Sequence, residues 1–564
     1  MPLEKAPTVV ILHSLFDIHN SFATVVGMTT PATASRPVRT RFAPSPTGYM
    51  HIGGMRTALF NWLWAKHCGG TFILRVDDTD QQRNLDSALG PILNAFRWLG
   101  LQWDEGPEVG GPHAPYFQSQ RRDRYRQMVE QLLTAGTAWL DFDPPELTKA
   151  DRTTAEAEKR TYLNVRRSLE LSDAERRRRV AEGQPHVVRL LVPRDQSVST
   201  VDHVRGRVTW DCGLIADPVI VRGDGSPLYN FASVVDDIDF EISHVIRAEE
   251  HLTNTATQLL VFQACGVAAP EFAHIPFVAA PGTTKKMSKR DLAKYQSSPH
   301  FKRLFDISNQ LLPKLGLTPG ETMNPVMVEF YEKVGFLPSA VLNTLARLGW
   351  SLDDKTEFMS LEFLTREFTL DRVVKSFAGL DVDKLFAFQE HWCGKLSATE
   401  ITDHCLPFLV TAGWVSAPVS AEDRDFVTRV VQALGERLKL FGEILSYEEY
   451  FVSDERWTID EAAFSKRLQQ APASVDLLRE FAVKLRTTET FAAADLDRLL
   501  HQFVAEKNVA MNQIIHALRI AVTGKAIGPG MFDCLALLGK EKCLRRIAWT
   551  LNRLNTPSVP AVNC

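Results

Sequence analysis

The segment 41–54 constrains the fold of this chain more than any other stretch of the sequence. Pro44 and Pro46 fix their own φ angles and keep the residues before them extended. Gly48 then permits a tight turn, and a strong helical pattern continues from residue 55. The segment therefore predicts a strand, a rigid turn and a helix in succession.

The first turn of that helix carries His51, Gly53 and Gly54. A helix amino terminus offers free N–H groups and partial positive charge, which suit a phosphate. The two glycines let a nucleotide lie against the backbone, where a Cβ would keep it away. The segment indicates a nucleotide-binding site, and the alternative is an ordinary turn between a strand and a core helix.

Two motifs in the sequence resemble those of a known family. Residues 44–54, which end in HIGG, resemble the HIGH signature of class I aminoacyl-tRNA synthetases in its glutamyl-tRNA synthetase form. The KMSKR run at 286–290 resembles the KMSKS loop of the same enzymes, although the residues that follow it depart from the usual pattern. The chain is therefore identified as resembling a bacterial-type glutamyl-tRNA synthetase over about residues 39–554.

The resemblance implies a fold of several domains, as the length of 564 residues also does. An α/β Rossmann-like catalytic domain would carry an inserted α+β domain for the acceptor end of tRNA, and all-α stem-contact and anticodon-binding domains would follow. After an extension over 1–36 that is expected to be disordered, the predicted boundaries are 37–116 and 227–300 for the two catalytic halves, 117–226 for the insertion, 301–400 for the stem-contact domain and 401–564 for the anticodon-binding domain.

Composition limits the possible partners only weakly. The net charge is −4, so RNA binding would need a local basic face. The basic run at 176–179 is either such a face or a solvated helix surface. No apolar run is long enough to cross a membrane, and the scattered cysteines fit a reducing compartment. Some glutamyl-type synthetases hold zinc in the inserted domain, but the comparable region, 138–143, lacks cysteine, so no structural zinc and no metal site are expected in this protein. The resemblance implies a cytoplasmic monomer.

Amino-acid activation joins two anions, since a carboxylate attacks the α-phosphate of ATP. It calls for positioning and charge neutralisation rather than a protein nucleophile. The resemblance assigns catalytic roles to His51, Lys286 and Lys289. It also implies ATP with Mg²⁺ as substrate, with contacts from Gly53, Gly54, Glu250, His251 and Lys289.

A glutamate substrate needs cations for its carboxylates, and arginine forms bidentate contacts with such groups. The resemblance places six residues around L-glutamate, with Asp77 in place of the usual Glu and Ser233 in place of the usual Asn. The set is Arg41, Ser45, Asp77, Tyr229, Ser233 and Arg247.

The expected function is attachment of glutamate to tRNA(Glu). Arg437, on an expected helix of the anticodon-binding domain, aligns with an arginine that accepts the anticodon of tRNA(Glu) and rejects that of tRNA(Gln); the alternative is a surface arginine. Three other functions compete: a non-discriminating synthetase that also charges tRNA(Gln), a tRNA-modifying paralogue, and an inactive RNA-binding homologue. The presence of the helical half argues against the second, and the intact His51 and Lys289 argue against the third.

Overall fold

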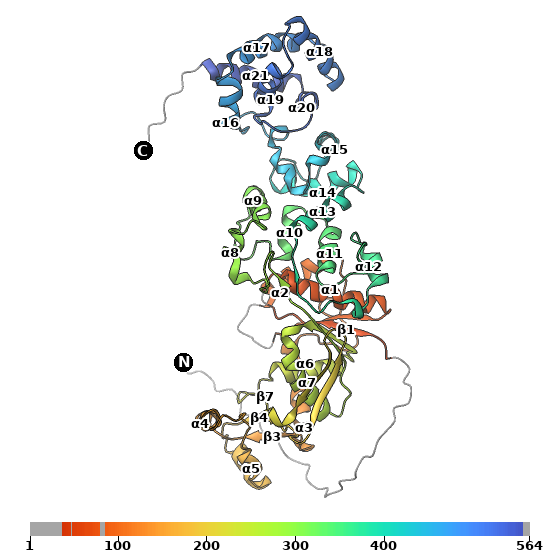
Figure 1. Ribbon diagram of the computed structural model, residues 1–564, viewed down its shortest axis with the longest axis vertical. Helices are drawn as coiled ribbons and strands as arrows, with labels where there is room; N and C mark the ends of the chain where they lie inside the picture. Colours follow the sequence, from red (N-terminus) through yellow and green to blue (C-terminus); the bar gives the residue numbers. More distant parts are fainter. Residues whose placement is uncertain (1–35, 47, 79–84, 556–564) are drawn as a thin grey trace, which may run out of the picture.

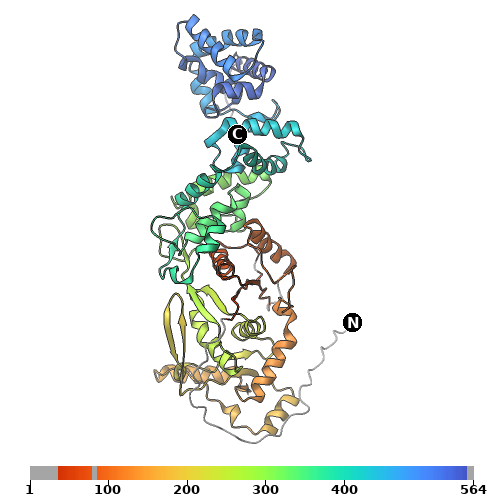
Figure 2. The same cartoon turned by 90° about the vertical axis from the view of Figure 1, so that its right-hand side faces the viewer.

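The computed structural model describes residues 36–46, 48–78 and 85–555, without the side chains of 85–87 and Lys289. The predicted amino-terminal extension therefore lies almost wholly outside the described residues. The molecule is elongated, with the sheets toward one end and a column of helices reaching the other (Figure 1). The view turned by 90° shows the same order along the long axis (Figure 2).

A six-stranded mixed sheet forms the centre of the catalytic half, in the order β2-β1-β8-β9-β5-β6. Every neighbouring pair in it is parallel except β5–β6. Because parallel strands end at the same edge, the residues that follow β1 and β8 come together. The strands are β1 Arg39–Phe42, β2 Thr71–Leu74, β5 Ser197–Asp202, β6 Gly206–Asp211, β8 His244–Ala248 and β9 Glu271–Ile275.

A smaller antiparallel sheet, β3-β4-β7, lies in the region predicted as the insertion. The hairpin β5–β6 belongs to the same sequence region but pairs with β9 of the main sheet. The predicted boundary between 226 and 227 therefore divides elements of one sheet. The remaining elements here are β3 Ala138–Asp141, β4 Val187–Leu190, β7 Val219–Val221, α3 Arg122–Thr134, α4 Pro145–Ala157 and α5 Asp173–Ala181.

Helices pack on the main sheet, and α1 is the most deeply placed of them. It packs against β1 and β8 on one side and against α11 and α12 on the other. This double burial explains why α1 is apolar nearly all round, with mostly buried side chains. The helices of this region are α1 Ile52–His67, α2 Leu85–Trp98, α6 Tyr229–Asp239 and α7 Leu252–Ala264.

The described chain after residue 300 is helical, as predicted, apart from the two-residue strand β11 Ala378–Gly379, which pairs with β10 Val278–Ala279. Sequence periodicity cannot reveal so short a pairing. The helices are α8 Leu292–Gln296, α9 Lys302–Leu311, α10 Val328–Val334, α11 Pro338–Arg347, α12 Leu361–Glu367, α13 Val382–Cys393, α14 Ala398–Thr411, α15 Ala421–Leu434, α16 Glu461–Phe464, α17 Pro472–Thr487, α18 Ala493–Glu506, α19 Asn512–Thr523, α20 Met531–Leu538 and α21 Lys540–Asn555.

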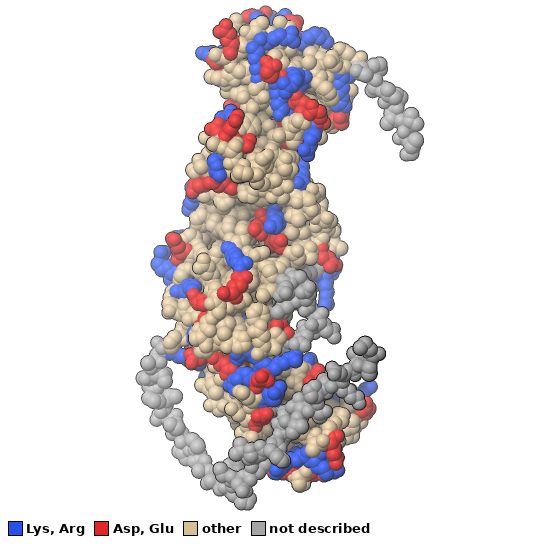
Figure 3. All heavy atoms as spheres, turned by 180° about the vertical axis from the view of Figure 1, so that it is seen from behind, with Lys and Arg blue, Asp and Glu red and all other residues tan. Residues whose placement is uncertain are grey.

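Surface charge is mixed rather than segregated. On the face in Figure 3, basic and acidic side chains lie side by side along the length, and basic side chains gather at the end that the carboxyl-terminal helices form. This distribution agrees with the small net charge of −4. Among the described residues, no helix has the length and apolar character needed to span a bilayer.

Candidate active site

A cavity of about 400 Å³ lies at the carboxyl ends of β1 and β8, beside the amino terminus of α1. Both predicted catalytic halves line it, so residues that are far apart in sequence share one wall. Eleven of the predicted site residues lie on this wall: Arg41, Ser45, His51, Gly53, Gly54, Asp77, Tyr229, Arg247, Glu250, His251 and Lys286.

His51 caps the amino terminus of α1. Its Nδ1 accepts a hydrogen bond of 2.9 Å from the backbone N–H of Gly53. A neutral ring with an accepting Nδ1 carries its proton on Nε2, and Nε2 lies 3.1 Å from the carbonyl oxygen of Met287. The backbone on either side of His51 is held by Val326 and Val328, through bonds of 3.0 and 2.9 Å. His51 thus joins the HIGG segment directly to the KMSKR segment.

The KMSKR segment is packed rather than free. Met287 is fully buried, and its backbone N–H donates to Val278 at 2.9 Å. Lys286 lines the cavity and forms an ion pair with Glu250. Tyr295, in the part that departs from the usual family pattern, accepts a 2.9 Å hydrogen bond from the N–H of Ser288 through its hydroxyl oxygen. Lys289 begins a short 3-10 turn, Lys289–Asp291.

Arg247 is a buried cation, and none of the described carboxylates lies at hydrogen-bond distance from it. Its Nε donates to His274 at 3.1 Å and its Nη2 to Thr255 at 2.8 Å, and both partners are uncharged acceptors here. Nη1 is buried and has no hydrogen-bond partner within the part of the chain that the structure describes. Burial lowers the pKa of Arg247 to about 10, which still leaves it charged at neutral pH. A buried guanidinium that faces a cavity in this state favours an incoming anion.

His274 is held as an acceptor by Asp202. The Nδ1 of His274 lies 2.6 Å from Asp202 and donates to it, which leaves Nε2 to accept from Arg247. Both side chains are fully buried. Sequence reasoning did not find this pair, because neither residue belongs to a family signature.

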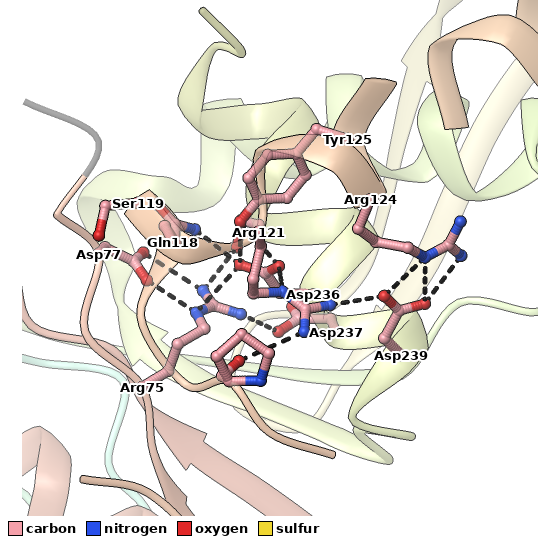
Figure 4. Close-up of polar contacts among 12 residues, drawn as sticks. Arg75, Asp77, Gln118, Ser119, Arg121, Arg124, Tyr125, Asp236, Asp237 and Asp239 are labelled. Atoms are coloured by element: carbon pink, nitrogen blue, oxygen red, sulfur yellow. Dashed lines mark hydrogen bonds and ion pairs between the residues drawn. The ribbon is translucent and has the colours of Figure 1, made fainter. Parts of the chain in front are cut away.

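Arg41 and Asp77 are both already paired in the structure. Arg41 forms a bidentate contact with Asp237, at 3.0 and 3.2 Å. Arg75 lies between Asp77, at 2.7 Å, and Asp237, at 2.8 Å (Figure 4). Burial would raise the pKa of Asp237, but Arg41 and Arg75 outweigh it and hold that pKa below its usual value. For Asp77 burial wins over Arg75, and its pKa rises to about 6.

Further ion pairs and hydrogen bonds lie on the side of α6 away from the cavity, and they connect α6 to α3. Asp236 accepts from Arg121 at 2.7 Å and from Tyr125 at 2.9 Å (Figure 4). Asp239 accepts from Arg121 at 2.5 Å and from Arg124 at 2.8 Å. These contacts hold α6 in place against α3. Asp237, on the same helix, is therefore held in position to pair with Arg41.

Ser233 is not among the residues that line the cavity. It is 0% exposed, and its hydroxyl accepts a 3.1 Å hydrogen bond from Arg75. Its contact with the ligand stays a prediction, since position in the motif gives no direction for a side chain on α6. Ser233 supports Arg75, which in turn holds Asp77 and Asp237.

We expect Ser233→Ala to change the KM for glutamate by less than about twofold. The same change should lower the free energy of unfolding by about 1–3 kcal/mol. The change leaves one N–H of a buried arginine without its acceptor. Substrate titrations and urea unfolding measure the two effects. Ser308→Ala is the matched control, because Ser308 is buried and its hydroxyl has no partner. A large rise in KM with unchanged stability would instead place Ser233 against the substrate.

Tyr229 and His251 lie near each other on the wall, with ring centroids 5.9 Å apart. Tyr229 is partly exposed. Burial, reinforced by the charge of Arg247, lowers the pKa of His251 to about 4, so its ring is neutral at pH 7. Sequence reasoning missed one more cation, Arg56 of α1, which lines the cavity and is buried. An arginine inside an otherwise apolar helix was the signal available for it.

The comparisons with known proteins agree with this geometry. Residues 37–324 and 320–387 match the family described as tRNA synthetases class I (E and Q), catalytic domain, and residues 400–551 match an anticodon binding domain. The sheet, the cavity and the two signatures that meet at His51 thus define a class I aminoacyl-tRNA synthetase.

Curated relatives indicate which amino acid these class I synthetases attach. A glutamate–tRNA ligase of Moorella thermoacetica is 39% identical over 90% of this chain and 97% of its own length. One from Anaeromyxobacter sp. is 37% identical over 90% and 98%. A crystal structure of a glutamate tRNA ligase from Elizabethkingia meningosepticum, in complex with its amino acid, has a TM-score of 0.76 at 32% identity and covers 92% of this chain and 100% of that one.

The chain belongs to the glutamate–tRNA ligase family, whose class I catalytic domain carries out ATP-dependent aminoacylation of tRNA. The family and the enzyme class predicted from the sequence are thereby confirmed, as are the Rossmann-like core and the helical anticodon-binding part of the fold. These relatives lend no support to the alternative of a synthetase that also charges tRNA(Gln).

Proposed function

We propose that the cavity residues of this chain activate L-glutamate with ATP and then pass the glutamyl group to the 3′ end of tRNA(Glu). The observation that carries the proposal is Arg247, a buried guanidinium on the cavity wall with no carboxylate at hydrogen-bond distance among the described residues. A substrate carboxylate supplies the missing acceptor and the missing charge. Arginine in this setting distinguishes glutamate from glutamine, whose neutral amide cannot balance the charge.

The rest of the amino-acid site follows from the neighbours of Arg247. Arg41 already shares its guanidinium with Asp237, so it can assist a second carboxylate but not balance one alone. Ser45 and Tyr229 offer hydroxyl groups at the same wall. Asp77 would face the α-ammonium group, since a carboxylate whose pKa is raised by burial gains much from a cation beside it.

The nucleotide would lie along the amino terminus of α1. Gly53 and Gly54 carry no side chain that could keep phosphates from the backbone, and His51 and Lys286 supply donors to them. Lys289 would add a positive charge from the KMSKR segment. Glu250 and His251 are proposed to contact the adenosine. ATP is taken as the Mg²⁺ complex, with the metal brought by the substrate.

The two steps balance without a covalent bond to the protein. A carboxylate oxygen of glutamate attacks the α-phosphorus, and the bond to the leaving pyrophosphate breaks. A hydroxyl of the terminal ribose of tRNA then attacks the carbonyl carbon, and AMP leaves. The developing negative charge lies on phosphate oxygens in the first step, where His51 and the lysines are placed to stabilise it.

Glutamate-dependent exchange of pyrophosphate into ATP tests the first step, measured with and without tRNA(Glu). Exchange with glutamate but not with glutamine, aspartate or buffer is the expected result. Exchange that does not depend on glutamate would contradict the proposal. The monomeric state and the cytoplasmic location implied by the resemblance stay predictions.

Choice of tRNA is proposed to reside in the helical part, with Arg437 as one determinant. The structure differs from the expectation here, because Arg437 is exposed in a 3-10 turn, Gly435–Arg437, rather than on a helix. The turn follows α15, toward the end of the molecule away from the sheets (Figure 1). An apolar hollow of about 160 Å³ is lined by Gly435 and Leu438, which lie on either side of Arg437 in the chain.

We expect Arg437→Gln to raise kcat/KM for charging tRNA(Gln) by about tenfold or more, equivalent to about 1.4 kcal/mol. The arginine would accept the smaller pyrimidine of one anticodon and obstruct the larger purine of the other. Charging of purified tRNA(Gln) and tRNA(Glu) with labelled glutamate measures the ratio. Arg429→Gln, on α15 and paired with Asp425, is the matched control. Efficient charging of tRNA(Gln) by the unaltered enzyme would establish the non-discriminating alternative.

A further inference from the structure

Three potential metal ligands meet at the edge of the main sheet opposite the cavity. Glu271 begins β9, His244 begins β8, and His203 directly follows β5. The Oε2 of Glu271 lies 2.7 Å from the Nε2 of His203 and 3.6 Å from the Nε2 of His244. One ligand atom from each residue lies within 4.8 Å of the others. The parallel register of the strands brings these residues together, although the sequence separates them widely.

The spacing suits a small ion. Nitrogen and oxygen ligands at 2.0–2.1 Å from a tetrahedral ion lie about 3.3 Å from each other. The observed separations of 2.7 and 3.6 Å bracket this value, and the ligand nitrogens of the two histidines lie within 4.8 Å of each other, so side-chain movements would bring the three atoms around one ion. The three residues leave further coordination positions open toward solvent, because Glu271 is exposed.

The outer nitrogens of the two histidines support the same conclusion. The Nδ1 of His244 lies 2.8 Å from the hydroxyl of Ser243, which also bonds to the backbone N–H and carbonyl of Arg39 at 2.7 and 3.1 Å. The Nδ1 of His203 faces the carboxylate of Asp371 at 4.0 Å. The outer nitrogen of His244 is thus within hydrogen-bond distance of an oxygen, as metal-bound histidines usually are, and a carboxylate lies 4.0 Å from the outer nitrogen of His203.

The hydroxyl of Ser243 can hold the proton of His244 on Nδ1. When that hydroxyl donates to the carbonyl of Arg39, it accepts from Nδ1–H of His244. The Nε2 lone pair of His244 then points toward a carboxylate oxygen of Glu271. Two electron-rich atoms facing each other repel, and a cation between them turns the repulsion into attraction.

We propose that His203, His244 and Glu271 bind a divalent transition-metal ion such as Zn²⁺, with Ser243 and Asp371 as outer partners. Two imidazoles and a carboxylate suit Zn²⁺ or Co²⁺ better than Mg²⁺ or Ca²⁺, which prefer oxygen ligands only. This proposal departs from the sequence-based expectation of no structural zinc, which rested on the absence of cysteine from 138–143; the ligands here are two histidines and a glutamate of the main sheet.

The site is separate from the catalytic residues. His244 precedes Arg247 by three positions on β8, a distance of about 10 Å along the strand. Asp371 belongs to a turn, Leu370–Arg372, in the helical part that follows α12. An ion held here would tie three strands of the sheet together and draw this turn toward them. Its expected role is structural.

Metal titration of the full-length, chelator-treated protein tests the proposal. We expect it to bind one Zn²⁺ with micromolar or tighter affinity by calorimetry, and to bind Co²⁺ with the visible absorption of a low-coordinate site. His203→Gln and Glu271→Gln should each weaken binding by about 100-fold, and Ser243→Ala by about tenfold, since outer partners contribute less than ligands. Zn²⁺ should raise the Tm of the unaltered protein and not that of the Glu271→Gln variant.

His501→Gln serves as the matched control. His501 lies 3.4 Å from Asp497 on α18 and forms a histidine–carboxylate pair outside the proposed cluster. This variant should bind Zn²⁺ as the unaltered protein does. Absence of stoichiometric Zn²⁺ binding would overturn the proposal. Binding that survives both His203→Gln and Glu271→Gln would overturn it too, because the ion would then be held elsewhere, for instance by the exposed Cys68.

Discussion

Replacement of Arg247 by lysine should raise the KM for glutamate by about 10–100-fold and change the KM for ATP by less than about twofold. Hydrogen bonds to charged groups contribute about 1.5–3 kcal/mol, and each 1.4 kcal/mol is a factor of ten. Lysine keeps the charge but cannot give two parallel N–H bonds to a carboxylate. It would also lose the bonds that Nε and Nη2 make to His274 and Thr255, which aim the guanidinium.

Steady-state pyrophosphate exchange, with each substrate varied in turn, measures the two KM values. Arg222→Lys is a suitable control, because Arg222 is an exposed arginine in the turn after β7, where it contacts Ser226. It should leave both values unchanged. An equal rise in the two KM values for Arg247→Lys would mean that Arg247 is structural or serves ATP, and would remove it from glutamate recognition.

The second large effect is expected for Lys289→Ala, which should lower kcat for adenylate formation by about 100-fold or more. A cation beside the phosphates stabilises charge that develops only in the transition state, so its loss affects kcat rather than substrate binding. Affinity for tRNA should stay nearly intact, because the KMSKR segment lies beside His51 of the catalytic cavity.

Single-turnover formation of glutamyl-adenylate and filter binding of tRNA separate the two quantities. Lys294→Ala provides the comparison, since Lys294 lies on the next turn and is paired with Asp291 at the surface. Its loss removes the same charge from the same segment without touching the signature. Activation kinetics that are unchanged in Lys289→Ala would exclude that lysine from the mechanism.

Sequence motifs can predict which residues share a cavity where a residue follows a strand or begins a helix. His51, Arg247 and Lys286 reach one cavity because parallel strands end at one edge and α1 starts there. The motifs do not determine side-chain direction, as for Ser233, whose hydroxyl accepts a hydrogen bond from Arg75. The motifs also do not predict the ion pair between Arg41 and Asp237.

The strand pairing of the main sheet is a second feature that the motifs do not determine. A hairpin such as β5–β6 has the same alternating pattern whichever sheet it joins, so its pairing with β9 was not predictable from the sequence. That pairing brings His203 beside Glu271 and Asp202 beside His274. Both the proposed metal ligands and the support of Arg247 therefore depend on contacts that no local pattern encodes.

The hydrogen bond from His51 to Met287 has a consequence for how the enzyme responds to nucleotide. The imidazole has one proton to donate, on Nε2, because Nδ1 is occupied by the N–H of Gly53. A phosphate that takes this proton must release the carbonyl of Met287. Nucleotide binding and the seating of the KMSKR segment thus compete for one donor, and thermodynamic linkage makes the competition reciprocal. A variant in which the KMSKR segment has lost its seated position should therefore bind nucleotide more tightly. The factor by which its affinity rises should equal the factor by which bound ATP shifts the segment away from that position.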